Sequence, residues 1–321
     1  MKGVTYFPWC PGIPWRSYQG KLSPYVPESI FLREIGRRDP VIICNGGLLE
    51  NYFALSYAEY IKSKTFYRKP VYWTGNHLYH PMVKANSLCS IVEQTVDNNI
   101  LRQYGTSIII DQENIYLNSL SKYLKYSGGR KKYNIYKNLA TQIWSNSGQK
   151  LGVEYLGKLR SGDKIREEIT SWGRVHKFDL NRPYVIVLPD EGYSQHKQVL
   201  IDWKESEIKA LAAMLGGAGM QVIVFTDYMR RVFNNPAFFV KKNILWIWYM
   251  LGGAKGIISR EIDFPIISLA YSQDCKIFGK KLKQPWRLKT NATLFNKGML
   301  VYESRAKSYF TPYEVYERLT G

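Results

Sequence analysis

The sequence has little of what builds disulfide frameworks, zinc sites or membrane spans. Its 321 residues include only four cysteines, at positions 10, 44, 89 and 275, and no Cys-x-x-Cys pair. We therefore expect reduced thiols and no metal site. No stretch approaches the roughly 20 consecutive apolar residues of a transmembrane helix, because the longest apolar runs have the length of a strand. The start also lacks the apolar core of a secretion signal, so we expect a cytoplasmic protein.

Several well-known catalytic and nucleotide-binding motifs are absent as well. The sequence has no Gly-x-Gly-x-x-Gly dinucleotide fingerprint and no Gly-rich phosphate loop ending in Gly-Lys-Ser or Gly-Lys-Thr. A Gly-x-Ser-x-Gly nucleophile elbow and a His-Glu-x-x-His metal motif are also missing. These absences disfavour dinucleotide binding and P-loop or kinase-type phosphoryl transfer.

Acidic residues are scarce relative to basic ones. Forty-five Lys and Arg stand against 26 Asp and Glu, which gives a net charge of +19. Such an excess favours polyanionic partners: nucleic acid, an acidic membrane surface or phosphorylated glycans. A lysine-rich, AT-biased genome is the alternative explanation.

The basic residues are concentrated in two acid-free stretches that also carry Tyr or Trp. Cations for phosphates beside aromatic rings for bases are typical of nucleic-acid grooves, although a charge run can also be an ordinary solvated face. The candidate nucleic-acid-binding residues are Lys122, Lys125, Arg130, Lys131, Lys132, Lys281, Lys283 and Arg287.

From residue 40 onward, short apolar runs alternate with amphipathic segments. This pattern predicts an α/β fold with parallel sheets, as two Rossmann-like, doubly wound domains that face a cleft. We expect domains at 1–175, with an irregular N-terminal arm, and 176–321, with a linker near 165–182. The last helix, near 311–319, is expected to pack back on the first domain. The predicted strands are 41–44, 70–74, 108–111, 184–188, 222–226, 256–259 and 275–278, and the main helices are 49–62, 203–215, 243–251 and 263–271.

The strand predicted at 41–44 runs into a glycine turn and then a helix start. Asn45, Gly46, Gly47 and Asn51 are therefore candidates for lining a cleft, since glycine lets the backbone approach a ligand closely. Glu50 is the one carboxylate at the head of the helix. It is either a catalytic base or an ordinary first-turn acid favoured by the helix dipole.

The loops after the later strands carry the other candidates, because open parallel sheets bind ligands outside the carboxyl ends of their strands. Lys197 offers a counter-charge for a diphosphate and Ser194 a hydroxyl donor, though a loop lysine can simply be solvated. Arg260 could meet phosphate, and Glu261 or Asp263 could bind ribose hydroxyls; Asp263 also suits a helix N-cap. The full donor-binding set is Ser194, Gln195, Lys197, Thr226, Arg260, Glu261 and Asp263.

The order of these pieces resembles the GT-B glycosyltransferases, especially the heptosyltransferase-like family. The segment 46–51 is similar to that family's Gly-Leu-Gly-Asp turn, with Leu49 in place of a Gly and Glu50 in place of the Asp base. The strand at 185–188, Lys197 and Trp203 look like the opening of its second domain. The family's Asp-Thr-Gly-x-x-His motif is replaced here by the segment 260–265.

The resemblance implies an inverting, metal-independent glycosyltransferase with the acceptor bound by the first domain and the nucleotide sugar by the second. Glu50 would be the base, no cofactor would be tightly bound, and the expected co-substrate is a UDP-sugar. The charge favours hydroxymethylated bases in viral DNA as acceptor, in the host cytoplasm. The alternatives are a cell-surface or lipopolysaccharide-type glycan transferase at an anionic membrane surface, and a non-catalytic nucleic-acid-binding protein of the same fold.

Overall fold

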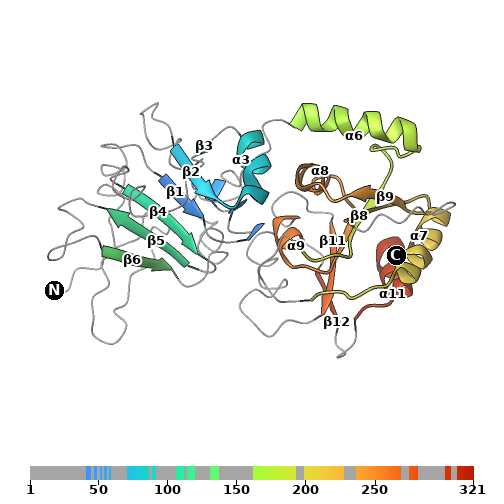
Figure 1. Cartoon of the computed structure of the whole chain (residues 1–321). Coiled ribbons are helices and arrows are strands. Elements are labelled where there is room, and N and C mark those ends of the chain that lie inside the picture. The colour runs from blue at the N-terminus through green and yellow to red at the C-terminus, as the bar shows by residue number, and fades with distance from the viewer. Residues whose placement is uncertain are drawn as a thin grey trace. The chain divides into compact units, whose positions relative to one another are not determined.

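The structure is a computed structural model in which the chain divides into two units, Met1–Arg160 and Ser161–Gly321 (Figure 1). It describes residues 41–44, 47–48, 51–52, 54–55, 58, 71–86, 89–91, 106–111, 114–119, 131–136, 162–192, 199–227, 236–268, 275–280, 301–304 and 309–321.

The first unit contains a six-stranded sheet in the order β3-β2-β1-β4-β5-β6. Strands β3, β2, β1 and β4 are parallel, whereas β5 and β6 continue the sheet in antiparallel pairing. Only two residues separate β4 from β5, too few for the crossover that a parallel pair needs. The strands are β1 (Val41–Cys44), β2 (Val71–Gly75), β3 (Cys89–Ile91), β4 (Thr106–Asp111), β5 (Asn114–Ser119) and β6 (Lys131–Tyr136). A 3-10 turn η1 (His77–Tyr79) and helix α3 (His80–Asn86) join β2 to β3.

The second unit is built on a parallel sheet in the order β12-β11-β10-β7-β8-β9. The chain winds outward from β7 through β8 to β9, then returns to β10 on the other side of β7. This is the doubly wound order, with its reversal between β7 and β10. The strands are β7 (Tyr184–Leu188), β8 (Gln221–Thr226), β9 (Phe238–Lys241), β10 (Gly256–Ser259), β11 (Lys276–Lys280) and β12 (Val301–Ser304).

The helices of the second unit cover this sheet with apolar faces. In α7 (Glu205–Gly217), Ile208, Leu211, Ala212 and Leu215 are buried at helical spacing and share a core with β7 and β8. The continuous apolar run of β7 is buried at all five positions, as expected for a strand covered on both faces. The other helices in the described part of this unit are α6 (Gly162–His176), α8 (Ile244–Met250), α9 (Asp263–Ser268) and α11 (Pro312–Thr320).

Most of the predicted elements are present near their expected positions. Strands 41–44, 184–188 and 256–259 are confirmed residue for residue. The described residues between 48 and 58 are helical, as expected for the segment after the glycine turn. The predicted α/β, doubly wound class is therefore confirmed for both sheets, with the antiparallel β5 and β6 as an addition to the first.

The linker expected at 165–182 is wrong, because most of it is helix α6 (Gly162–His176). Its buried positions Ile165, Ile169 and Gly173 recur every four residues, which gives a narrow stripe inside a strongly charged segment. The helix packs on α8, where the Trp172 and Trp246 rings lie 5.9 Å apart. The unit boundary accordingly falls before α6, at Arg160, and not at the expected residue 175.

The last helix packs on other elements of the second unit. Helix α11 packs beside α7, and its buried residues Val315 and Leu319 belong to the core of the second unit. The Trp203 indole N–H donates to the Phe310 carbonyl oxygen at 2.8 Å and fixes the segment that leads into α11. The apolar face of α11 is therefore buried in the core of its own unit.

Candidate functional site

The residues that follow β7 and β10 meet at the point where the second sheet reverses its winding. The Arg260 amide donates to the Leu188 carbonyl oxygen at 2.8 Å, so the first residue after β10 lies against the end of β7. On the other side, the Leu200 amide donates to the Arg260 carbonyl oxygen at 3.0 Å. In an open α/β sheet, this carboxyl edge is where ligands bind.

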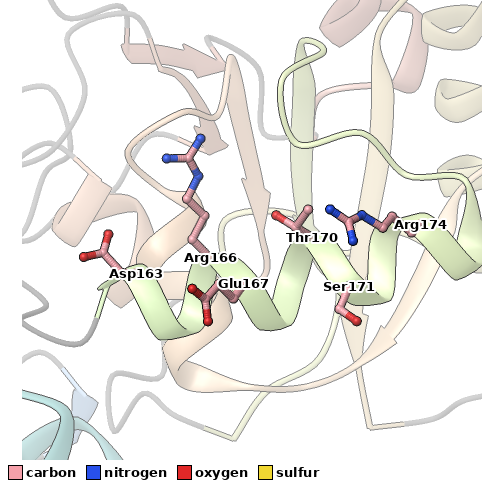
Figure 2. A pocket seen from close by; sticks show the side chains of 6 residues that line it. All are labelled: Asp163, Arg166, Glu167, Thr170, Ser171 and Arg174. Atoms are coloured by element: carbon pink, nitrogen blue, oxygen red, sulfur yellow. The ribbon is translucent and has the colours of Figure 1, made fainter.

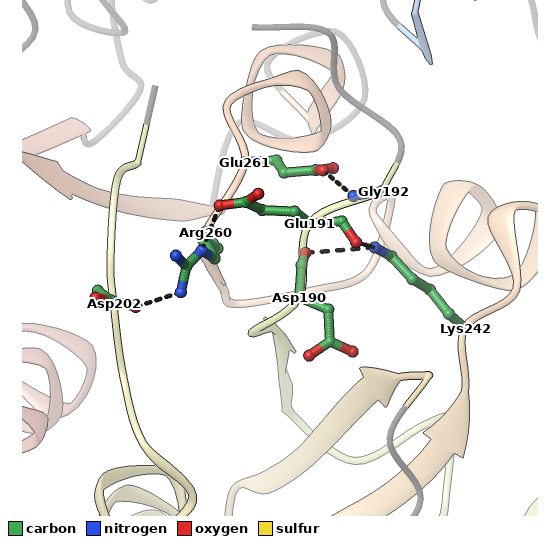
Figure 3. Close-up of polar contacts among 7 residues, drawn as sticks. All are labelled: Asp190, Glu191, Gly192, Asp202, Lys242, Arg260 and Glu261. Carbon is green, nitrogen blue, oxygen red and sulfur yellow. Dashed lines mark hydrogen bonds and ion pairs between the residues drawn. The ribbon is translucent and has the colours of Figure 1, made fainter. Parts of the chain in front are cut away.

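The Arg260 side chain connects two loop segments through carboxylates (Figure 3). Its Nε donates to Glu191 Oε1 at 2.8 Å, and its Nη1 donates to Asp202 Oδ1. The Arg260 side chain is 31% exposed, while Glu191 and Asp202 are 66% and 51% exposed. The hydrogen bond to Glu191 is the main cause that raises the pKa of Arg260 above its ordinary value. The guanidinium is thus charged and donates hydrogen bonds to two carboxylates.

Glu261 joins the same two loops from the buried side. Its side chain is 5% exposed and accepts a hydrogen bond from the Gly192 amide. Gly192 has a φ of +144°, which a residue with a Cβ rarely adopts, so the loop needs glycine at this position. Ser259 Oγ donates to the Glu261 carbonyl oxygen at 2.6 Å and orders the turn after β10.

Lys242 holds the loop after β7 from the opposite direction (Figure 3). Its Nζ donates to the carbonyl oxygens of Asp190 and Glu191 at 3.3 and 3.1 Å. Asp190 in turn accepts from the Asp227 amide, the first residue after β8, at 2.8 Å. The segments that follow β7, β8, β9 and β10 are therefore connected into one edge, with two cations and four carboxylates among the residues of Figure 3.

The predicted donor-binding residues divide into three groups. Arg260 and Glu261 lie together at this edge. Thr226 and Asp263 are 4% and 0% exposed, and the Thr226 carbonyl oxygen accepts from the Lys242 amide at 3.3 Å. Ser194, Gln195 and Lys197 lie outside the described residues.

In the first unit, two of the predicted cleft residues contact each other. The Asn51 Nδ2 donates to the Gly47 carbonyl oxygen at 2.8 Å, and the Asn51 amide donates to the same oxygen at 3.1 Å. Asn51 is completely buried, so it holds the turn from inside instead of lining a cleft. Asn45, Gly46 and the candidate base Glu50 lie outside the described residues.

Two histidines, His77 and His80, follow β2. Parallel pairing places Cys44 opposite Gly75, so β1 and β2 end at the same edge of the sheet. Asn76 caps η1 by accepting from the Leu78 amide at 2.9 Å. The exposed His77 ring then lies 4.5 Å from the ring of His80.

The predicted nucleic-acid-binding residues are little represented in the described part of the chain. Lys131 and Lys132 lie in β6 and pair with Ser119 and Asn118 of β5. The other predicted members of this set lie outside the described residues: Lys122, Lys125, Arg130, Lys281, Lys283 and Arg287.

A hollow of about 540 Å³ lies along α6 (Figure 2). Arg166, Thr170 and Arg174 follow one another at four-residue spacing, and Asp163, Glu167 and Ser171 form the neighbouring row. All six described lining residues come from one helix, whereas the edge at β7 and β10 brings together loops from several strands. We therefore take that edge as the candidate site.

Within the described ranges, no helix has both the length and the apolar character needed to cross a membrane. In the same residues, no three or more His, Cys, Asp and Glu side chains are grouped as metal ligands would be.

Comparison with known proteins identifies the architecture. The solved structure of the E. coli ADP-heptose lipopolysaccharide heptosyltransferase II aligns with a TM-score of 0.55 at 11% identity, over 88% of this chain and 97% of that one. The chain has a heptosyltransferase-like GT-B fold. Two structures of E. coli heptosyltransferase WaaC also align, each with a TM-score of 0.49. The structure with ADP-2-deoxy-2-fluoro heptose is 9% identical over 87% of this chain and 98% of that one. The structure with ADP is 10% identical over 87% of this chain and 96% of that one. No protein-family profile and no curated protein sequence matches the chain.

Three residues of the candidate site were not predicted from the sequence: Glu191, Asp202 and Lys242. Glu191 and Asp202 flank the loop in which Ser194 and Lys197 were selected, but their contact with Arg260 depends on how β7 and β10 pair. Lys242 follows β9, a four-residue strand that the sequence did not predict. The run Phe238–Lys241 before Asn243, which caps α8, is the signal that could have found it.

Proposed function

We propose that this protein is an inverting glycosyltransferase that uses a nucleotide sugar. The observation that carries the proposal is the GT-B fold together with a connected, charged edge at the winding reversal of the second sheet. The aligned E. coli protein is named for ADP-heptose as its donor. That edge is where a doubly wound sheet binds a nucleotide.

In an inverting transfer, the acceptor hydroxyl oxygen attacks the anomeric carbon of the sugar. The bond from that carbon to the diphosphate oxygen breaks, and the hydroxyl proton passes to a base. The products are the glycosylated acceptor and a nucleoside diphosphate. The leaving diphosphate needs hydrogen-bond donors and positive charge, which in this proposal come from protein groups and not from a metal.

In this proposal Glu50 is the base, because it stands in the segment 46–51 where the resembling family has its Asp base. Ser194, Gln195, Lys197 and Arg260 bind the diphosphate. Thr226, Glu261 and Asp263 belong to the nucleoside side of the site.

The acceptor is proposed from the charge of the chain. A net charge of +19, with basic residues beside aromatic ones, suits DNA, and hydroxymethylated bases supply the hydroxyl group that the reaction needs. Transfer of this kind belongs in the cytoplasm of an infected host. A UDP-sugar is the first donor to test.

A second candidate is favoured by the fold comparison. The aligned E. coli protein is named as a lipopolysaccharide heptosyltransferase. The acceptor would then be a phosphorylated glycan, held near an anionic membrane surface by the same positive charge. A non-catalytic nucleic-acid-binding protein with this fold is the third candidate.

One panel experiment separates these candidates. UDP-, GDP- and ADP-sugars are incubated with the full-length protein and either hydroxymethylated DNA, plain DNA or a phosphorylated glycan. Digested nucleosides and glycans are then weighed by mass spectrometry. A sugar-sized mass increase on a nucleoside supports the first candidate, and one on the glycan supports the second. Salt-sensitive DNA binding without transfer supports the third.

A further inference from the structure

The Arg260 guanidinium is held by carboxylates from two segments of the chain. Glu191 lies before residues 193–198 and Asp202 lies after them, and each accepts a hydrogen bond from Arg260. Both carboxylates are more than half exposed, while Arg260 is two-thirds covered. Exposed ion pairs of this kind contribute about 0 to 1 kcal/mol to stability, so these pairs are exchangeable.

While these ion pairs are intact, the carboxylates at this edge outnumber the cations and disfavour the binding of a polyanion. Lys242 and Arg260 are the cations of the described network, which also contains the four carboxylates of Asp190, Glu191, Asp202 and Glu261 (Figure 3). A guanidinium binds carboxylate and phosphate oxygens with the same forked donor geometry. A diphosphate at this edge therefore competes for the same N–H groups that Glu191 and Asp202 occupy.

We propose that Glu191 and Asp202 are internal competitors for Arg260, so that a nucleoside diphosphate binds by replacing them at the guanidinium. The two acids thereby set how tightly the site holds the diphosphate. This inference rests on the proposed nucleotide-sugar function, since it concerns the phosphate groups of the same donor.

A purely structural role makes the opposite prediction. If Arg260 only fastens the loop, loss of either carboxylate loosens the loop, and ligand binding weakens or stays the same. If the acids compete with the ligand, their neutralisation strengthens binding. The direction of the change in affinity distinguishes the two roles.

The test uses Asp202→Asn and Glu191→Gln in the full-length chain. Each amide keeps an oxygen that can accept from Arg260, so the loop contact survives while the charge is removed. Glu205→Gln is the matched control, because Glu205 is an exposed carboxylate that pairs with Lys209 at 2.7 Å on α7. Binding of UDP, ADP and inorganic pyrophosphate is measured by titration calorimetry, and thermal unfolding checks the fold of each variant.

We expect Asp202→Asn and Glu191→Gln each to bind the probes about fivefold more tightly. Each substitution removes one negative charge, and the repulsion between unit charges about 4 Å apart in water has this magnitude. Glu205→Gln should match the wild type, and Arg260→Gln should bind more weakly. Weaker or unchanged binding by both acid variants overturns the inference and leaves the proposed function standing. Tighter binding without sugar transfer in the panel supports the inference and contradicts the proposed function. No binding of any probe by any variant counts against both.

Discussion

The Lys242 ammonium lies 3.1 Å from the carbonyl oxygen of Glu191 and crosses from the end of β9 to the loop after β7. It also reaches the Asp190 carbonyl oxygen, so one side chain fixes two consecutive peptide groups. These peptides precede Gly192, whose amide is held by Glu261. The loop that starts the candidate donor site is thus ordered from two directions.

Replacing Lys242 with Met should weaken binding of UDP or ADP about tenfold, because the charge-assisted hydrogen bonds that shape the loop are lost. Lys241→Met is the matched control, since Lys241 is the exposed adjacent residue, the last of β9. Titration calorimetry measures both affinities. Equal effects of the two substitutions would show that Lys242 contributes only its net charge.

The sequence was most informative where one physical signal dominated. The run Tyr184–Leu188 is apolar throughout and is buried throughout, so a strand was predictable. Helix α6 was missed because its buried stripe is only Ile165, Ile169 and Gly173 within a charged segment. The ion pairs of Arg260 could not be predicted, because they depend on which strands are neighbours in the sheet and not on any local spacing.

Gly173→Ala should destabilise the second unit, although alanine is the better helix former by about 1 kcal/mol. A Cβ at Gly173 would collide with the Phe178 carbonyl oxygen, and the Phe178 amide closes the end of α6 by donating to the Gly173 carbonyl oxygen. We expect a net loss of about 1 to 3 kcal/mol in the free energy of unfolding, measured in urea.

The control for that experiment is Gly216→Ala in α7. No atom lies within 4 Å of a Cβ built at Gly216, so helix propensity should act alone there. This variant should be stabilised by up to about 1 kcal/mol. If both variants shift in the same direction, the close contact at Gly173 does not limit the helix.

The start of α11 should be sensitive to acid. Thr311 and Glu314 form a capping box: the Thr311 amide donates to Glu314 Oε2 at 2.7 Å, and the Glu314 amide donates to Thr311 Oγ1 at 3.3 Å. The backbone hydrogen bond from Thr311 is the main cause that lowers the pKa of Glu314. A lowered pKa means that this stabilisation is present above the unfolded-state pKa of about 4.3 and is lost as the pH falls through the lower folded-state value.

Thr311→Ala should therefore lower the free energy of unfolding by about 1 kcal/mol at pH 7. The difference between the wild type and the Glu314→Gln variant should narrow as the pH drops below about 4, because the wild-type carboxylate becomes protonated. Urea unfolding at pH 7 and at lower pH measures both effects. A constant difference across that range would contradict the capping role of the carboxylate.

Cys275 should be unreactive in the folded protein. It is completely buried immediately before β11, and burial raises the pKa of its thiol to about 12. Since the thiolate is the reactive form, iodoacetamide at pH 8 should leave Cys275 unlabelled in the native protein and label it in urea. Peptide mass spectrometry reads both samples, with the partly exposed Cys89 as the internal comparison. Rapid native labelling of Cys275 would show that this part of the sheet opens.

Sugar transfer with Glu50 as the base is the central claim. The direct measurement is nucleoside diphosphate release and the mass of the acceptor in the donor panel, compared between the wild type, Glu50→Gln and the control Glu205→Gln. We expect a sugar-sized mass increase on an acceptor with the wild type and with Glu205→Gln, and its loss with Glu50→Gln. Transfer that survives in Glu50→Gln would contradict the base assignment, and no transfer by the wild type from any donor would contradict the proposed function.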